Sequence, residues 1–140
     1  MSATISELIL EGKRLPITFV ESQVVKEGVT CDIYTIDDDR TKDLAVIEIQ
    51  PGFRSPRQKV IKGDLTIQRF FSGAAYLYVD ELDGSKRTRF FKSQEATQNN
   101  DVEVKVGEIM QWSSLGPDPL IYHEICEPPF EKGRFEDLPE

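Results

Sequence analysis

The stretch at residues 44–73 constrains the fold of this chain most, because short apolar runs alternate there with turn signals. It reads LAVIEIQPGFRSPRQKVIKGDLTIQRFFSG. Residues 44–49 are almost all apolar, which suits a core strand, and a Pro-Gly pair then marks a turn. Two further strands are expected at residues 58–62 and 65–71, and a Gly-Asp pair separates them.

The same pattern of short strands and turns continues through the chain. Asp83-Gly84 lies between two strand-like runs and is a strong hairpin signal. The second strand of that hairpin carries several Lys and Arg residues, which would protect a sheet edge. Turn signals at such short spacing favour an all-β sandwich or barrel. The remaining strands are expected at residues 17–25, 30–36, 74–81, 85–91, 102–106, 109–112 and 120–126.

Two terminal segments are expected to differ from this pattern. Residues 2–10 predict a short N-terminal helix, because Ile5 and Leu8 lie three residues apart and Gly12 follows them. The tail after Cys126 begins with prolines and is too polar for a strand. We expect this tail to lie over the surface of the barrel or of a partner subunit.

Length and charge bound the possible functions. The chain has 140 residues, which corresponds to one domain spanning residues 1–140. Its net charge of −8 argues against nucleic acids and anionic membranes as partners, because both require a basic face. The N-terminus lacks basic residues ahead of its apolar ones, and no window is long enough for a membrane span. With Cys31 and Cys126 as the only cysteines, we expect free thiols and a cytoplasmic location.

The central stretch resembles the first motif of the cupin superfamily, which consists of a glycine, two histidines, a glutamate and a second glycine. Gly52 and Gly73 match the two glycines. The histidine positions hold Gln58 and Val60, and the glutamate position holds Thr66. The usual metal ligands are therefore missing, and we expect neither a metal nor another cofactor.

The second cupin motif resembles the region near Gly107, where a glycine-led strand runs into a turn. Its histidine should follow that turn, where this chain has Leu120, and the one histidine of the chain is His123. The resemblance covers the chain from residue 44 to the C-terminus. It implies an all-β, cupin-type double-stranded β-helix, which is a jelly-roll barrel. It also implies a homodimer, for which residues 17–25 are a suitable strand.

Strand alternation then predicts which side chains point into the barrel. The resemblance places the residues at the ligand positions of the motif inside, and alternation extends this set along neighbouring strands. The set offers amide, hydroxyl, aromatic and carboxyl groups, which suit a neutral polar or sugar-like ligand. The expected ligand-binding residues are Gln58, Thr66, Gln68, Tyr76, Tyr78, Tyr122 and Glu124, with Arg54 and Arg57 at the mouth to bind a carboxylate or phosphate.

His123 and Tyr122 are the candidate catalytic residues. The resemblance extends to metal-independent cupins that epimerise nucleotide sugars with a histidine base and a tyrosine acid. In those enzymes the histidine belongs to the first motif, where this chain has Gln58 or Val60. The other interpretation of His123 is a structural histidine near one end of the barrel.

The sequence thus predicts a small cupin-like protein that binds a small polar or sugar-like ligand in its barrel without metal chemistry. A metal-independent isomerase or epimerase is the first alternative. A structural or interaction dimer with a filled barrel is the second, and a divergent metal-dependent enzyme is the third. The expected partners are a small molecule and a second copy of the chain.

Overall fold

A computed structural model describes residues 5–93, 100–129 and 134–139, and strands are the only regular elements in these ranges. Nothing in these ranges forms a helix with the length and apolar character needed to cross a lipid bilayer. The strands are β1 (Glu7–Leu10), β2 (Lys13–Lys26), β3 (Val29–Ile36), β4 (Asp43–Ile49), β5 (Gln58–Val60), β6 (Leu65–Ser72), β7 (Ala74–Asp80), β8 (Lys86–Lys92), β9 (Asp101–Glu103), β10 (Ile109–Ser114), β11 (Leu120–Glu127) and β12 (Phe135–Asp137).

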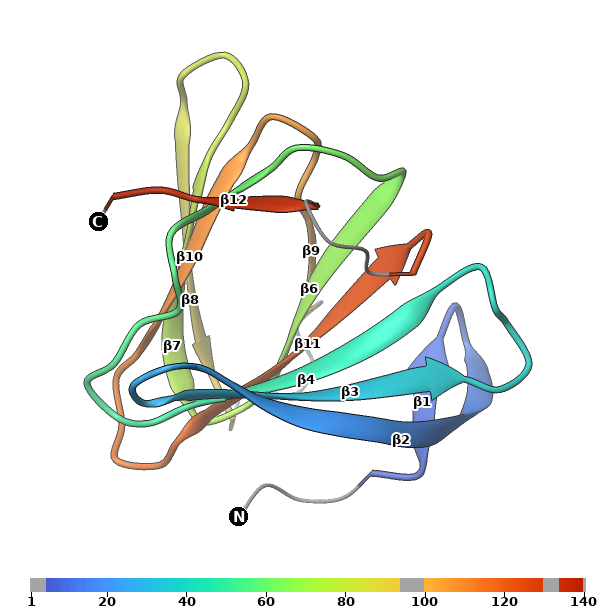
Figure 1. Cartoon of the computed structure of the whole chain (residues 1–140). Coiled ribbons are helices and arrows are strands. Elements are labelled where there is room, and N and C mark those ends of the chain that lie inside the picture. Colours follow the sequence, from blue (N-terminus) through green and yellow to red (C-terminus); the bar gives the residue numbers. More distant parts are fainter. Residues whose placement is uncertain (1–4, 94–99, 130–133, 140) are drawn as a thin grey trace.

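The strands form two antiparallel sheets that curl around a shared interior (Figure 1). The larger sheet has the order β1-β2-β3-β4-β11-β6-β9, and the smaller sheet has the order β12-β5-β10-β7-β8. Strands far apart in sequence are neighbours within each sheet, such as β4 beside β11 and β5 beside β10. This arrangement confirms the all-β jelly roll predicted from the sequence. The basic strand β8 lies at a sheet edge, as its Lys and Arg residues predicted.

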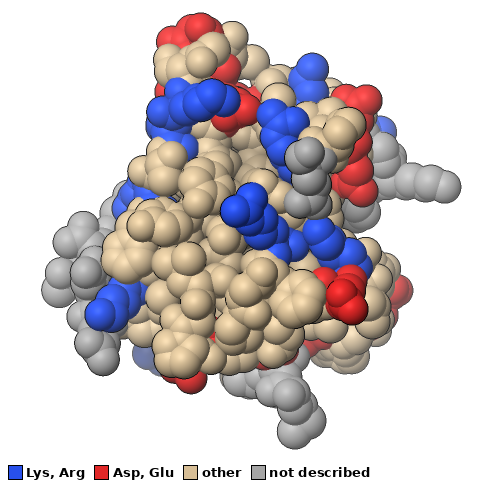
Figure 2. Space-filling model, turned by 90° about the vertical axis from the view of Figure 1, so that its left-hand side faces the viewer, with Lys and Arg blue, Asp and Glu red and all other residues tan. Residues whose placement is uncertain are grey.

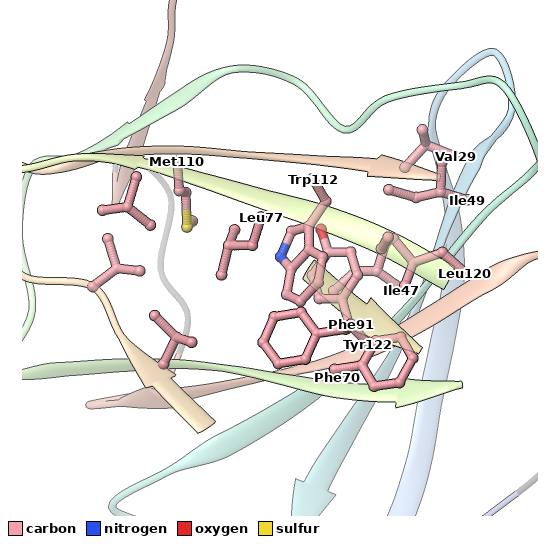
Figure 3. Packing of buried hydrophobic residues seen from close by; sticks show 14 of the residues in the cluster. Val29, Ile47, Ile49, Phe70, Leu77, Phe91, Met110, Trp112, Leu120 and Tyr122 are labelled. Carbon is pink, nitrogen blue, oxygen red and sulfur yellow. The ribbon is translucent and has the colours of Figure 1, made fainter. Parts of the chain in front are cut away.

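Aromatic rings from both sheets fill much of the interior (Figure 3). Trp112 from β10 stacks on Tyr122 from β11 with 4.5 Å between ring centroids. Phe91 from β8 lies 5.6 Å from Trp112 and 5.2 Å from Phe70 of β6. Aromatic pairs of this kind contribute about 0.5–1.5 kcal/mol each beyond the burial of their area. The four rings therefore bind the two sheets to each other.

A second core lies on the opposite face of the seven-stranded sheet. The β1–β2 hairpin packs Leu8, Leu10 and Ile17 there, against Leu44 and Val46 of β4 among others. Ala45, Ile47 and Ile49 of the same strand face the barrel interior instead. Burial on both faces explains why the β4 sequence is apolar without alternation.

Both terminal segments differ from their predictions. Residues 7–10, which the sequence placed in a short helix, form the strand β1. Its Leu8 and Leu10 are buried while Glu7 and Ile9 are exposed, so the period is two residues. The polar tail also forms a strand, β12, which pairs with β5. This strand has three residues, and Phe135 anchors it by packing against the core.

Gly73 connects the two sheets at the turn from β6 to β7. Its φ is 101°, a conformation that side chains with a Cβ rarely adopt. A Cβ atom there would also lie 2.6 Å from the carbonyl oxygen of Pro119. The last glycine of the cupin-like motif is thus required by backbone geometry and by a close approach of the chain.

Arg134 ties the C-terminal segment to the barrel. Its side chain is fully buried and donates from Nη1 to the Pro128 carbonyl oxygen at 2.9 Å. Nη2 donates to the carbonyl oxygens of Leu65 and Glu127 at 2.7 and 3.1 Å. Gly63 makes room for this contact, because a Cβ atom there would overlap the guanidinium group.

We expect Arg134→Met to lower the free energy of unfolding by about 3 kcal/mol, because three carbonyl oxygens lose a buried charged donor. Urea unfolding followed by circular dichroism measures this loss. Arg14→Met is the control, because Arg14 is exposed and forms a long surface ion pair with Glu7 at 3.8 Å. This variant should leave the free energy of unfolding nearly unchanged. A loss below about 1 kcal/mol for Arg134→Met would contradict the conclusion that Arg134 holds the C-terminal segment to the barrel.

Candidate functional site

A cavity of about 240 Å³ lies between the sheets, next to the aromatic rings. Strands β2, β3, β4 and β11 line it on the side of the seven-stranded sheet, and β5 and β12 line it on the other side. Its walls are mainly apolar. The polar side chains in the lining, apart from two thiols, are those of Gln23, Asp43, Gln58, Tyr122 and Glu124.

Glu124 is held in this wall by a chain of buried hydrogen bonds. The Trp112 indole donates from Nε1 to Gln68 Oε1 at 3.0 Å, and Gln68 Nε2 donates to Glu124 Oε2 at 2.7 Å. An indole N–H can only donate, so it fixes the orientation of the Gln68 amide, which then presents its NH₂ group to the carboxyl. Glu124 therefore accepts at Oε2 in either protonation state, and its exchangeable proton resides on Oε1.

Burial raises the pKa of Glu124 from its ordinary value of 4.5 to about 7. The hydrogen bond from Gln68 acts in the opposite direction, and the negative charge of Asp43 adds to the rise. A carboxyl group with this pKa exchanges its proton near neutral pH, which is the property that a general acid or base requires.

The raised pKa of Glu124 makes stability depend on pH. Between pH 4.5 and 7 the unfolded chain loses this proton while the folded chain keeps it, so the free energy of unfolding falls as pH rises. Relative to Glu124→Gln, the natural chain should lose about 3 kcal/mol across this window. Urea unfolding of both proteins at pH 4.5 and 7.5 measures the difference. Glu103→Gln replaces an exposed carboxyl group and keeps Glu124, so it should follow the pH dependence of the natural chain. Equal slopes for all three proteins would refute the shift.

Two thiols complete the lining of the cavity. Cys31 and Cys126 are both free, as the sequence predicted. Burial raises the pKa of Cys31 to about 12 and raises that of Cys126 as well, with the Glu124 carboxylate as the next cause in both. Both thiols stay protonated at neutral pH, so they are uncharged parts of the cavity lining and not nucleophiles.

Part of the predicted ligand-binding set meets at this cavity. Gln58, Tyr122 and Glu124 line it, and Gln68 orients Glu124 from behind. Thr66 is buried elsewhere, and its hydroxyl accepts a hydrogen bond from Arg134 at 3.4 Å. Sequence reasoning did not identify Gln23 and Asp43. The sequence carried no signal for them, because their places in the lining depend on strand pairing: Gln23 pairs with Cys31, and Asp43 pairs with Cys126.

The structure places Tyr76 and Tyr78 on the outer face of β7, so the prediction that they point into the barrel is wrong. Between them Leu77 points inward and is buried. Both tyrosines share a face, as expected, but that face also carries Phe90, whose ring centroid is 5.4 Å from Tyr76. Figure 2 shows this side of the molecule as a mostly tan surface, over which Lys and Arg side chains are spread, with Asp and Glu side chains toward the top and the right.

Arg54 and Arg57 also lie away from the cavity. Arg57 donates to Asp80 at 3.1 Å, beside the outer face of β7. Arg54 is exposed, and its backbone forms an isolated bridge with Ser113. The sequence predicted that these two arginines lie at the mouth of the ligand site. Neither side chain lines the cavity described above, so this cavity does not meet the prediction.

His123 and Tyr122 occupy opposite faces of β11, so the structure does not bring these two candidate catalytic residues together. The His123 ring stacks on Phe71 at 4.9 Å, outside the barrel. Neither ring nitrogen has a hydrogen-bond partner among the described residues, and both are buried. Burial first and the charge of Arg69 second lower the pKa of His123 to about 4, and Asp101 opposes this shift.

The lowered pKa of His123 predicts a loss of stability in acid. As pH falls from 6.5 to 4, His123 binds a proton in the unfolded chain but stays neutral in the folded chain, so the free energy of unfolding falls. His123→Phe keeps a ring against Phe71 and removes the titration. We expect the natural chain to lose about 3 kcal/mol relative to this variant between pH 7.5 and 4.5, as measured by urea unfolding. An equal or larger loss for the variant would contradict the burial of His123 as a neutral ring.

Comparisons with known proteins agree with this architecture. No family model and no curated protein matches the sequence. Solved structures of Bacillus subtilis oxalate decarboxylase do match, one of them at a TM-score of 0.66 and 20% identity over 81% of this chain. A mutant of that enzyme matches at 0.67 and 19% over 82%. The chain has the cupin fold. It spans 29% of the length of these matched chains.

The cupin fold raises the question of a metal, since one matched structure is described by its Mn(II) centers. At the motif positions, the amide of Gln58 already donates to Asp137 at 2.9 Å, and Val60 is a buried apolar side chain. The Thr66 hydroxyl is bonded to Arg134. Within the described residues, no three His, Cys, Asp or Glu side chains are grouped to hold a metal ion. These residues do not fit the usual cupin metal centre.

Proposed function

We propose that this cupin-fold chain binds a small, neutral, hydroxyl-rich molecule, such as a sugar or polyol, in the cavity beside Glu124. The observation that carries the proposal is a carboxyl group with a fixed orientation in the wall of a 240 Å³ cavity. Such a group accepts hydrogen bonds from ligand hydroxyls when ionised and can also donate one when protonated.

The size and walls of the cavity support a small ligand with an apolar side. Pockets for drug-sized molecules occupy about 300–1,000 Å³, so this cavity suits something smaller. Val25, Ile47 and Phe135 give it apolar surface, while Gln23 and Gln58 add amides that both donate and accept. A sugar ring presents the same combination of C–H faces and hydroxyl edges.

The charges of the lining disfavour anions. Asp43 and Glu124 are the charged side chains that line the cavity, and both are acidic. A carboxylate or phosphate ligand would face these groups at close range in a partly desolvated space, which is repulsive. The proposal therefore does not extend the oxalate chemistry named for the matched enzyme to this chain.

A thermal-shift screen of sugars, polyols and small organic acids tests the proposal. We expect neutral hydroxylated compounds to raise the melting temperature by mass action, and acids to have no effect. Glu124→Gln should weaken binding about tenfold, the loss expected for one hydrogen bond to a charged group. Ala45→Leu should abolish binding by filling the cavity, since Ala45 lines it.

Ala74→Leu is the matched control, because it adds the same volume at the start of β7, away from the cavity lining. Binding that survives in Ala45→Leu would place the ligand elsewhere. Stabilisation by acids alone would overturn the argument from charge. No response to any compound would favour the alternative of a structural or interaction protein.

Proton transfer at the same site is a second candidate function, and the pKa of Glu124 favours it. Tyr122 lies two residues away on the same face of β11, and burial raises the pKa of its phenol, so the hydroxyl stays protonated. Glu124 as base and Tyr122 as acid would form an isomerase or epimerase pair. This assignment replaces His123, which faces away from the cavity.

Deuterium exchange tests the second candidate. Sugars that bind in the thermal-shift screen would be incubated with the protein in D₂O and followed by proton NMR. Loss of one carbon-bound proton signal from the natural chain and none from Glu124→Gln would establish proton abstraction by this group. Binding without exchange would leave the chain as a binding protein.

A further inference from the structure

The C-terminal strand β12 brings the carboxyl group of Asp137 to the edge of the cavity. In the pairing of β12 with β5, Asp137 lies opposite Gln58 and Phe135 lies opposite Val60. Side chains two residues apart share one face of a strand, so Asp137 is on the face of β12 that carries Phe135. Phe135 and Gln58 both line the cavity. Asp137 is therefore next to one of the polar groups of the candidate ligand site.

A hydrogen bond to Asp137 fixes the orientation of the Gln58 amide. Gln58 Nε2 donates to Asp137 Oδ1 at 2.9 Å. A carboxylate can only accept, so the amide has to turn its NH₂ group toward Asp137. The carbonyl oxygen, Oε1, is then directed away from Asp137. Among the residues that the structure describes, none donates a hydrogen bond to this oxygen, which leaves it available to a ligand.

Backbone contacts hold β12 in place on both sides of this pair. The Ile61 N–H donates to the Arg134 carbonyl oxygen at 2.9 Å, and the Leu138 N–H donates to the Arg57 carbonyl oxygen at 2.8 Å. The buried guanidinium group of Arg134 anchors the same segment. Asp137 itself is exposed. A substitution of Asp137 can therefore change the Gln58 amide while these contacts keep the strand in position.

The two glutamines at this site are oriented in opposite senses. The Trp112 indole can only donate, so Gln68 gives its NH₂ group to Glu124. Asp137 can only accept, so Gln58 keeps its NH₂ group for Asp137 and offers its oxygen. Glu124 accepts or donates according to its protonation, which changes near neutral pH. The Gln58 oxygen has no proton to exchange, so it accepts at every pH at which Asp137 is ionised.

We propose that Asp137 is a positioning residue that selects the ligand through Gln58. Because Oε1 is an acceptor, the ligand has to place a hydroxyl group against it. An ether, ketone or lactone oxygen at that point would leave two acceptors facing each other without a proton, which a site built for a hydroxyl group disfavours. The proposal rests on the proposed function and narrows it to small aldoses and polyols, in preference to the corresponding lactones.

NMR of the Gln58 side chain tests the orientation without any ligand. The two protons on Nε2 give separate proton–nitrogen signals, and Gln58→Leu identifies them by their loss. We expect Asp137→Asn to move one of these signals upfield, because the proton loses a charged acceptor. Glu136→Gln is the matched control, since it neutralises the adjacent carboxyl group on the other face of β12, and it should leave both signals in place. Unchanged signals in Asp137→Asn would overturn the orientation.

Calorimetric titration with xylose and its deoxyfluoro analogues tests the selection. Each analogue carries one fluorine in place of a hydroxyl group, and fluorine cannot donate. We expect the analogue altered at the hydroxyl group next to Gln58 to bind the natural chain about fivefold more weakly than xylose. Asp137→Lys offers only donors, so the Gln58 amide should reverse and turn its NH₂ group to the ligand. The same analogue should then bind within about twofold of xylose.

The ratio of the two affinities within one protein cancels any general effect of the added charge, because both ligands are neutral. Glu136→Gln should keep the ratio of the natural chain, and circular dichroism confirms that each variant is folded. Xylose binding with the same ranking of analogues in the natural chain and Asp137→Lys would overturn the selection and leave the proposed function intact. No binding of xylose to the natural chain would also overturn it, and the wider thermal-shift screen then shows whether the proposed function fails as well.

Discussion

The stack of Trp112 on Tyr122 is the contact on which the rest of this barrel depends. It joins β10 of one sheet to β11 of the other, and Phe70 and Phe91 extend it toward β6 and β8. Large rings occupy that part of the interior, as Figure 3 shows. Toward β3, β4 and β5 the inward side chains are smaller, Cys31 and Ala45 among them, and packing leaves a cavity there. The location of the site is thus a consequence of where the aromatic volume is placed.

Gln68 links this packing to the chemistry of the cavity. The oxygen of its amide accepts a hydrogen bond from the Trp112 indole, and the nitrogen donates one to Glu124. A buried carboxyl group is unfavourable when ionised, and the raised pKa of Glu124 expresses that penalty. Proteins accept such penalties at functional sites when the surrounding structure is stable enough. The second core under the β1–β2 hairpin, which buries Leu8 and Leu10, provides stability of this kind.

Much of the fold follows from the sequence, and the candidate site follows only in part. Turn signals and apolar runs located most strands, and the cupin resemblance together with alternation placed Gln68 and Glu124 inside the barrel, where the structure has them. Alternation also showed that Tyr76 and Tyr78 share a face, but it does not say which face, because both faces of that sheet carry aromatic residues. The strand β1 was mistaken for a helix, because a spacing of three residues fits either period in so short a segment. Asp43 was missed because its position in the cavity depends on pairing with β11, which is remote in sequence.

The buried position of Trp112 has a practical consequence for solution studies of this protein. It is the only tryptophan in the chain, so all intrinsic indole fluorescence originates at one point in the interior. That point is separated from the Glu124 carboxyl by a single amide group. Emission intensity and wavelength should respond to the local electric field, and hence to the ionisation of Glu124 or to a molecule beside it. The fold thereby supplies an optical reporter of its own cavity, with no need for a label.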